Sequence, residues 1–387
     1  MLALLTGVTW AVAVSWLLTR VLRQFRAYRE ALLLPLGSPV NPAAISVIVP
    51  ARNEIENIEN CLAGLEKQTC LSRRASIIIV DDDSQDGTMA AIESHVRRDP
   101  RIRLVAAGTL PEGWVGKPRA CWRGALLAEG DWLCFIDADV RAAPELVAAA
   151  ATTAEAQRID MLSIQPRQEF NSFWERVIMP AGLLMIACAK RCAIGDEAVN
   201  GQVLLIRRTT YFQVGGHSAV RAEICEDKAL AARVRQAGCC VRVKAAGELA
   251  RTRMYRDLGS LWEGLSKNAT EILGSNRATL TAAGVAFVFG WTVLLLPIVI
   301  FLAALKHPSP ESVVAGALAL SGSAAVVGIH AGTASHFRLP AAFGLSFPLG
   351  YTLAACLAVH GVVLHVRGRI TWKGRTYRLH RQSPQPM

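Results

Sequence analysis

Residues 77–88 read IIIVDDDSQDGT, a β-branched apolar run followed at once by three aspartates. Such a run is typical of a buried strand, and the polar cluster marks its end. Three consecutive carboxylates repel one another, which is unfavourable without a compensating partner. A turn that holds a polar ligand is one explanation. The other is a solvated turn that caps the next helix, with Ser84 or Asp86 as the N-cap.

Two further runs of the same kind flank this stretch, with helix-like segments such as Glu56–Lys67 and Thr88–Arg98 between them. Ile45–Val49 comes before it and Trp132–Ile136 after it. This alternation predicts a parallel sheet covered by helices, an α/β fold. Ligands bind such sheets at the carboxyl ends of the strands. The candidate binding residues are therefore those that follow the three runs, at Arg52–Glu54, Asp81–Asp86 and Asp137–Asp139.

Two acidic pairs have their own chemical interpretation. Asp137 and Asp139 leave a buried strand one residue apart, which suits a hard divalent cation, although Asp-x-Asp also occurs by chance. Glu226 and Asp227 begin an amphipathic helix. They either complement the helix dipole or place a general base at the mouth of a site.

The N-terminus predicts a membrane anchor. Residues 1–19 carry no charge, and at 1.5 Å per residue they nearly match a bilayer core of about 30 Å. Four arginines follow the run, at positions 20, 23, 26 and 29. A secretory signal peptide would carry its positive charge before the run. We expect an uncleaved anchor with its N-terminus outside and the next domain in the cytoplasm.

Three apolar stretches follow residue 275, at 281–305, 312–334 and 341–366. Three crossings would put the C-terminus outside, whereas a tail with six basic residues and no acid at 367–387 favours the inside. One stretch is therefore expected to be re-entrant or interfacial, and the Gly-, Ala- and Ser-rich 312–334 is favoured. The apolar segment 170–190 is interrupted by charge and proline, so an interfacial or core helix is expected there.

The composition excludes several classes of protein. An apolar fraction of 52% and a mean hydropathy of +0.30 exclude disorder for most of the chain. Most of the net charge of +11 lies in residues 20–30 and 367–387, which abut apolar runs. It therefore indicates membrane flanks and no nucleic-acid partner. Ten cysteines without a Cys-x-x-Cys pair indicate neither a zinc site nor a disulfide framework.

The motifs in their order resemble those of the family 2 inverting glycosyltransferases of the GT-A fold. The resemblance covers the domain from residue 45 to about 240. It rests on five motifs: Ile45–Glu54, Asp81–Thr88, Gly116–Ala120, Asp137–Asp139 and Glu226–Asp227. The string LPEGWVGKPRACWRGA at 110–125 and TWKGRTY at 371–377 are similar to the hopene-associated glycosyltransferases, with the bacterial carotenoid-acid glycosyltransferases a close second.

The chain departs from that pattern at three points. Asp83 stands where the family usually has glycine, and Trp122 where many members have asparagine. The Gln-x-x-Arg-Trp motif of the processive members is absent. Transfer of a single sugar is therefore expected, rather than synthesis of a long polysaccharide.

The resemblance implies a nucleotide-diphospho-sugar donor and a role for each matching residue. Glu54 and Asp82 would hold the nucleoside and Asp81 would support their turn, with Pro50 and Arg52 in the same donor segment. Lys117 would approach the diphosphate, unless it is an ordinary surface lysine. Asp139, with Asp137, would anchor Mg²⁺ or Mn²⁺. Asp227, beside Glu226, would take the proton from the acceptor hydroxyl.

Basic and aromatic residues near the membrane have two interpretations. Arg253, Arg256, Trp262 and Lys267 either close over the diphosphate, as the equivalent region does in relatives, or form an interfacial belt. The same choice applies to Trp372, Lys373 and Arg375, which reach the site only if the tail is cytoplasmic.

The expected protein is a GT-A nucleotide-diphospho-sugar transferase domain with transmembrane helices at both ends, in a bacterial-type inner membrane. The anchored site favours a lipid acceptor, hopanoid or otherwise isoprenoid-derived. A polyprenyl-phosphate acceptor and a non-catalytic membrane scaffold are the alternatives. The expected layout is an anchor at 1–19, a basic linker at 20–44, a cytoplasmic domain at 45–275 with an interfacial helix at 170–190, a membrane region of two to three spans at 281–366 and a basic tail at 367–387.

Overall fold

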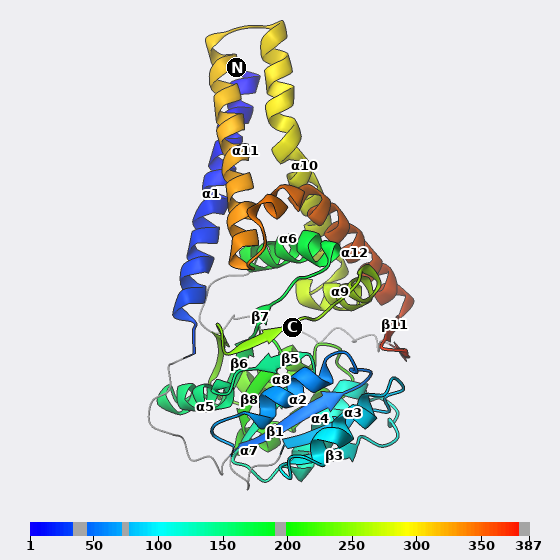
Figure 1. Ribbon diagram of the computed structural model, residues 1–387. Coiled ribbons are helices and arrows are strands. Elements are labelled where there is room, and N and C mark those ends of the chain that lie inside the picture. The colour runs from blue at the N-terminus through cyan, green and yellow to red at the C-terminus, as the bar shows by residue number, and fades with distance from the viewer. Residues whose placement is uncertain (34–44, 72–76, 190–198, 379–387) are drawn as a thin grey trace.

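The protein is described here from a computed structural model, which covers residues 1–33, 45–71, 77–189 and 199–378. Figure 1 shows an α/β body from which a stalk of long helices rises. The predicted linker at 34–44 and the end of the predicted tail at 379–387 lie outside the described residues, as does residue 190 of the predicted interfacial helix.

The α/β fold predicted from the sequence is confirmed. The described residues form a seven-stranded sheet in the order β3-β2-β1-β4-β8-β6-β9. Strands β3, β2, β1 and β4 are parallel, whereas β8 is antiparallel to both of its neighbours. These strands are β1 (Ile45–Ala51), β2 (Ile77–Asp81), β3 (Ile102–Ala106), β4 (Trp132–Ile136), β6 (Met161–Gln165), β8 (Val203–Arg207) and β9 (Val241–Ala245).

Helices cover both faces of this sheet because its strands are apolar on both sides. Val47 and Val49 of β1 pack with α2 and α5, whereas Ile48 between them packs with α4 and α8. The helices of the body are α2 (Ile58–Glu66), α3 (Thr88–Val96), α4 (Gly116–Leu127), α5 (Leu146–Ala156), α7 (Arg208–Gln213) and α8 (Glu226–Gln236). A small second sheet of β5 (Val140–Ala142), β10 (Ala250–Thr252) and β7 (Arg167–Gln168) lies beside the strand ends.

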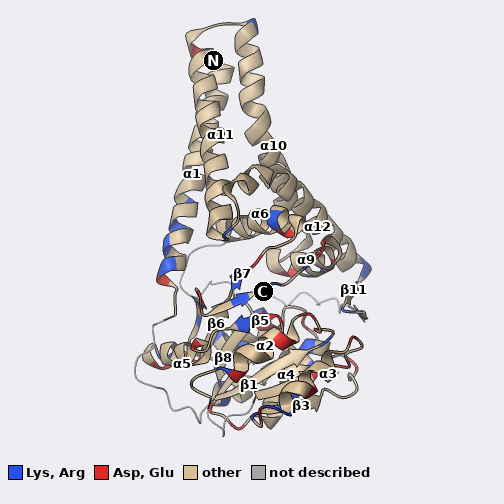
Figure 2. Ribbon diagram, viewed as in Figure 1, with Lys and Arg blue, Asp and Glu red and all other residues tan. Residues whose placement is uncertain are grey.

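Among the described residues, four helical stretches are long and apolar enough to cross a membrane. They are α1 (Leu2–Glu30), α10 (Asn276–Lys306), α11 (Pro310–His336) and the stretch Ala341–Arg367, which holds a 3₁₀ turn and α12 (Phe347–Arg367). Figure 2 shows that Lys and Arg gather where α1 approaches the body, while the stalk above is almost free of charge up to its tip. Helix α1 continues past the predicted end of the anchor at residue 19, so Arg20 to Arg29 lie on its last turns.

The membrane-helix arrangement differs from the sequence-based expectation. The stretch 312–334, expected to be re-entrant or interfacial, lies in the long helix α11, which packs lengthwise on α1 (Figure 1). It is α12 that lies obliquely, across α6 (Phe173–Ala189) and α9 (Leu258–Leu273). Glycines permit this close packing, because a Cβ at Gly361 would collide with the carbonyl oxygen of Ser266 on α9. The chain therefore returns to the body after α11.

Beyond α12 the chain forms a β-hairpin of β11 (Arg369–Trp372) and β12 (Arg375–Arg378). Its tip contacts the strand ends of the body, since Arg375 pairs with Asp82 and Lys373 with Glu54. The described part of the basic tail is thus on the same side of the stalk as the α/β body.

Candidate active site

A cleft of about 1290 Å³ lies at the carboxyl ends of the strands, between the α/β body and the foot of the helices. Nine of the ten predicted site residues line it: Pro50, Arg52, Glu54, Asp82, Lys117, Asp137, Asp139, Glu226 and Asp227. Asp81, the tenth, lies at the end of β2 and is buried. The structure therefore brings together residues that are spread over most of the body's sequence.

The turn after β2 is held by its own hydrogen bonds. Asp81 Oδ2 accepts from the backbone N–H of Ser84 at 3.2 Å, and Asp86 accepts from the backbone N–H groups of Thr88 and Ile55. Although burial opposes it, the hydrogen bond from the Thr88 hydroxyl and those from the backbone N–H groups lower the pKa of Asp86. Asp86 thus supports the start of α3, but the N-cap of that helix is Gly87 and not Ser84 or Asp86 as predicted.

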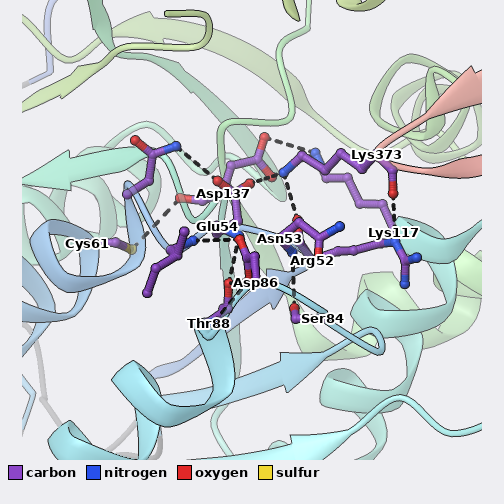
Figure 3. A network of polar contacts seen from close by, with 12 residues as sticks. Arg52, Asn53, Glu54, Cys61, Ser84, Asp86, Thr88, Lys117, Asp137 and Lys373 are labelled. Atoms are coloured by element: carbon purple, nitrogen blue, oxygen red, sulfur yellow. Dashed lines mark hydrogen bonds and ion pairs between the residues drawn. The ribbon is translucent and has the colours of Figure 1, made fainter.

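Asp82 and Glu54 face the cleft from neighbouring strand ends. The register that pairs Ala51 with Asp81 sets them side by side. Asp82 Oδ2 lies 2.6 Å from Arg375 Nη1, whereas its buried Oδ1 has no hydrogen-bond partner among the described residues. Glu54 accepts from Asn57 Nδ2 at 2.9 Å and pairs with Lys373. Figure 3 shows Arg52 and Lys373 meeting near Glu54.

Asp137 and Asp139 follow β4 at the centre of the cleft. Lys117 Nζ lies 2.7 Å from Asp137 Oδ1. Figure 3 shows the side chains of these two residues. Asp139 Oδ1 is buried and makes no hydrogen bond within the part of the chain that the structure describes. Burial, together with the charges of Asp137 and Glu54, raises the pKa of Asp139 to about 7. A buried carboxylate oxygen without a partner, beside a second carboxylate, fits a divalent cation.

Glu226 and Asp227 begin α8 on the other side of Lys117. Glu226 Oε1 lies 3.0 Å from Lys117 Nζ. Asp227 Oδ1 accepts from the backbone N–H of Lys228 at 2.7 Å, and the absence of a side chain at Gly201 leaves room beside it. Burial and the neighbouring Glu226 raise the pKa of Asp227 to about 6. A carboxylate of this pKa is ionised and basic near neutral pH.

The segment Asn200–Gln202 also lines the cleft, although it is not among the residues predicted from the sequence. The carbonyl oxygen of Gln202 accepts from the backbone N–H of Asp137 at 2.9 Å, and Asn200 Nδ2 donates to Gln202 Oε1 at 2.8 Å. This segment therefore fixes the backbone that carries the central aspartates. The sequence feature that could have identified this segment is the polar Asn-Gly-Gln directly before the apolar strand β8.

Two predicted arginines have structural partners. Arg253 Nη2 lies 2.9 Å from the buried Glu175 of α6, and Arg256 Nη2 donates to Asn57 Oδ1 at 2.8 Å. These contacts tie the chain before α9 to α6 and to the start of α2. Arg256 and Lys267 both line the cleft, and Lys267 Nζ lies 3.7 Å from the ring centre of Trp372. Burial lowers the pKa of Lys267 to about 8.

Comparison with known proteins agrees with this geometry. Residues 46–225 match the family model described as Glycosyl transferase family 2, so the α/β body contains a glycosyltransferase domain of that family. This match and the curated relatives of the chain, which are glycosyltransferases, identify the protein as a glycosyltransferase.

Two relatives and one solved structure illustrate the similarity. The 4,4'-diaponeurosporenoate glycosyltransferase of Staphylococcus aureus strain MRSA252 is 27% identical over 258 residues, 65% of this chain and 67% of the relative. The protein of that name from strain USA300 is 24% identical over 356 residues, 89% of this chain and 90% of the relative. A mannosyltransferase from Pyrobaculum calidifontis in complex with GDP-Man and Mn2+ aligns with a TM-score of 0.48 and 17% identity, over 92% of this chain and 98% of that one.

Proposed function

We propose that this protein is a membrane-bound inverting glycosyltransferase that moves one sugar from a nucleotide-diphospho-sugar to an isoprenoid-derived lipid, with a hopanoid as the candidate that the sequence favours. One observation carries the proposal. A single cleft holds the donor-side acids, the Asp137–Asp139 pair and Asp227, and continues to the foot of the membrane helices.

The membrane end of the cleft supports a lipid acceptor. Its lining includes Gln24 and Tyr28 of α1, Leu183 of α6 and Thr333 of α11. Gln24 Nε2 donates to the carbonyl oxygen of Ala187 at 2.7 Å, which joins α1 to α6 at this level. An apolar chain can lie among these helices while its hydroxyl reaches the acids. The relatives are named for diaponeurosporenoate, an isoprenoid-type acceptor, which agrees with this class.

The position of the basic residues supports the proposed location. Arg20 to Arg29 lie where α1 meets the body, and Lys and Arg flank membrane helices on the cytoplasmic side. We place the α/β body on the cytoplasmic face of a bacterial-type inner membrane, where nucleotide sugars are present. The stalk of α1, α10 and α11 then crosses the bilayer, and α6 and α12 lie at its surface.

On the donor side, Asp139 and Asp137 would hold Mg²⁺ or Mn²⁺. Such an ion, when bound, neutralises charge that develops on the departing nucleoside diphosphate. Lys117 meanwhile fixes the Asp137 carboxylate from the α4 side and faces the same region. Its ammonium stays protonated: although burial opposes it, Asp137 and Glu226 raise its pKa well above the usual value. Lys117 therefore offers the diphosphate a permanent positive charge.

On the acceptor side, Asp227 is the general base. Its carboxylate takes the proton of the acceptor hydroxyl as that oxygen attacks the anomeric carbon, and the bond to the diphosphate breaks. Inversion requires attack from the face opposite the leaving group, so base and diphosphate lie on opposite sides of the sugar. Lys117 contacts both Asp137 and Glu226, the residue before Asp227, so its side chain lies between the pair that would hold the metal and the start of α8.

The test is transfer of labelled sugar from UDP-, GDP- and dTDP-sugars into a total lipid extract, with Mn²⁺ or Mg²⁺ and the full-length protein. A labelled lipid that depends on both the metal and Asp139, judged with Asp139→Ala, supports the proposal. Label only in water-soluble products would contradict it. A product cleaved by mild acid or mild base as a phosphodiester would instead identify a polyprenyl-phosphate acceptor. Protein that binds no nucleotide at all would favour a non-catalytic scaffold.

A further inference from the structure

The hairpin β11–β12 lies far along the sequence from the strand-end residues of the cleft, but it forms part of the cleft wall. Trp372, Lys373 and Tyr377 line the cleft together with residues of β1 and α4. The hairpin leaves α12 at Gly368, which has the left-handed backbone that ends the helix. Ile370 is buried, so the hairpin is packed in place rather than extended into solvent.

Four polar contacts fix the tip of the hairpin to the donor-side segments. Lys373 Nζ pairs with Glu54 and donates to the carbonyl oxygen of Arg52 at 3.0 Å. Arg52 Nε in turn donates to the carbonyl oxygen of Lys373 at 3.2 Å. Arg375 Nη1 lies 2.6 Å from Asp82 Oδ2. The two hairpin cations therefore engage the two acids that face the donor end of the cleft.

A glycine on α4 permits this fit. A Cβ at Gly116 would lie 3.1 Å from Tyr377 Oη and 3.2 Å from Arg375 Nη1, and it would collide with Asp82 Oδ2. The far side of the hairpin rests on α9, where Trp372 covers Lys267. Contacts on both sides place the hairpin over the first turn of α4, beside Lys117.

The arrangement at Asp82 leaves one oxygen for a ligand. Arg375 holds Oδ2, and the side chain is buried, yet Oδ1 has no partner among the residues that the structure describes. An unpaired buried carboxylate oxygen is unfavourable unless something donates to it. A base N–H of a nucleotide is a donor of the right kind.

We propose that the β11–β12 hairpin is part of the donor site and binds a nucleoside diphosphate. Arg375 is a positioning residue that fixes Asp82 so that its free oxygen accepts from the base. Lys373 is a binding residue: it neutralises Glu54 in the free protein and supplies positive charge to the diphosphate when ribose hydroxyls bind that acid. This inference rests on the proposed function, because it names the residues of the same donor site.

The experiment measures nucleotide affinity with the full-length protein in detergent. The probes are UDP, GDP and dTDP with Mn²⁺, and the corresponding nucleosides without phosphate. We expect Lys373→Gln to weaken binding of the preferred diphosphate by roughly tenfold to a hundredfold, the range for a bond to a charged group. The affinity of this variant for the nucleoside should not fall, because a nucleoside has no phosphate for Lys373 to bind and Lys373 no longer competes with the ribose for Glu54. Arg375→Gln should weaken both probes, because it acts through Asp82 on the base.

Two further variants control for folding and charge. Arg369→Gln removes one charge from an exposed residue at the base of the hairpin and should leave affinity unchanged. Lys373→Arg keeps the charge and should retain most of the binding even if Lys373→Gln folds poorly. If Lys373→Gln and Arg375→Gln bind the diphosphate as tightly as the unaltered protein or more tightly, this inference is overturned and the proposed function is not. No binding by the unaltered protein would overturn the proposed function, and the inference with it.

Discussion

Lys117 and Asp137 form a two-pronged ion pair, with Nζ 2.7 Å from Oδ1 and 2.9 Å from Oδ2. The same nitrogen lies 3.0 Å from Glu226 Oε1. One ammonium therefore joins the end of β4, which carries the candidate metal ligands, to the start of α8, which carries the candidate base. The positions of these two halves of the site depend on each other through this residue.

We predict that Lys117→Gln lowers kcat/KM for sugar transfer by roughly 10²–10³-fold, the range for loss of one preorganised electrostatic group. The change removes a positive charge from the diphosphate region and leaves Asp137 and Glu226 without their shared partner. Steady-state kinetics with labelled donor measures it. Lys67→Gln, on an exposed lysine at the end of α2, is the control. A loss below threefold would show that Lys117 is an ordinary surface lysine.

Replacing Asp227 should remove general-base catalysis. Asp227→Asn is expected to lower kcat by roughly 10²–10⁴-fold, while nucleotide affinity stays within about twofold because the base does not hold the donor. Asp131→Asn, on an exposed residue, is the matched control. Near-normal turnover by Asp227→Asn, with none by Asp139→Ala, would show that the base assignment is wrong.

The pH profile of the unaltered enzyme offers an independent check on Asp227. Its pKa is about 6, and only the ionised form accepts a proton. At saturating Mn²⁺, kcat/KM should therefore fall about tenfold per pH unit below that value. The measurement is transfer rate between pH 5 and 8. A flat profile across that range would contradict Asp227 as the base.

The same raised pKa predicts a stability effect. Between the unfolded pKa of 3.8 and the folded value of about 6, the folded state binds more protons than the unfolded state. Stability therefore falls as pH rises through this window. We expect Asp227→Asn to unfold at a higher temperature than the unaltered protein at pH 7.5, with the difference shrinking toward pH 4. A variant that is less stable at pH 7.5 would show that the ionised carboxylate has net favourable partners.

Much of the fold and the acids of the cleft could be predicted from the sequence. Strand ends carry a local signal, a β-branched run that stops at polar residues, and parallel strands bring such ends to one edge. The hairpin contact could not be predicted this way. Arg375 and Asp82 are 293 residues apart, and their contact depends on how α12 crosses α6 and α9. The hydropathy of α11 and that of the stretch with α12 are similar, so the sequence does not show which of the two helices lies obliquely. Only the packing of α12 distinguishes it from α11.

Asp83 stands where the family usually has glycine, and its backbone conformation gives a further prediction. Asp83 has φ +60°, the left-handed region where glycine is free of strain and an aspartate is disfavoured by on the order of 1 kcal/mol. Its contacts with Arg52 and Arg375, at 3.7 and 3.4 Å, contribute little because the side chain is 66% exposed. Asp83→Gly should therefore leave the melting temperature unchanged or raise it, and Asp83→Val should lower it. A clear loss of stability in the glycine variant would show that the ion pairs outweigh the strain.

The contact between α1 and α11 should depend on a small residue. A Cβ at Gly322 would lie 2.7 Å from Trp10 Nε1, so α1 approaches α11 closely only because this position has no side chain. Gly322→Leu should lower stability by roughly 1–3 kcal/mol, the usual effect of overpacking. Gly328→Leu on the same helix is the matched control, because a Cβ there meets nothing within 4 Å. Thermal unfolding of both variants in one detergent gives the comparison. Equal melting temperatures would mean that α1 does not pack on α11 in this register, and the membrane end of the cleft would then need a different wall.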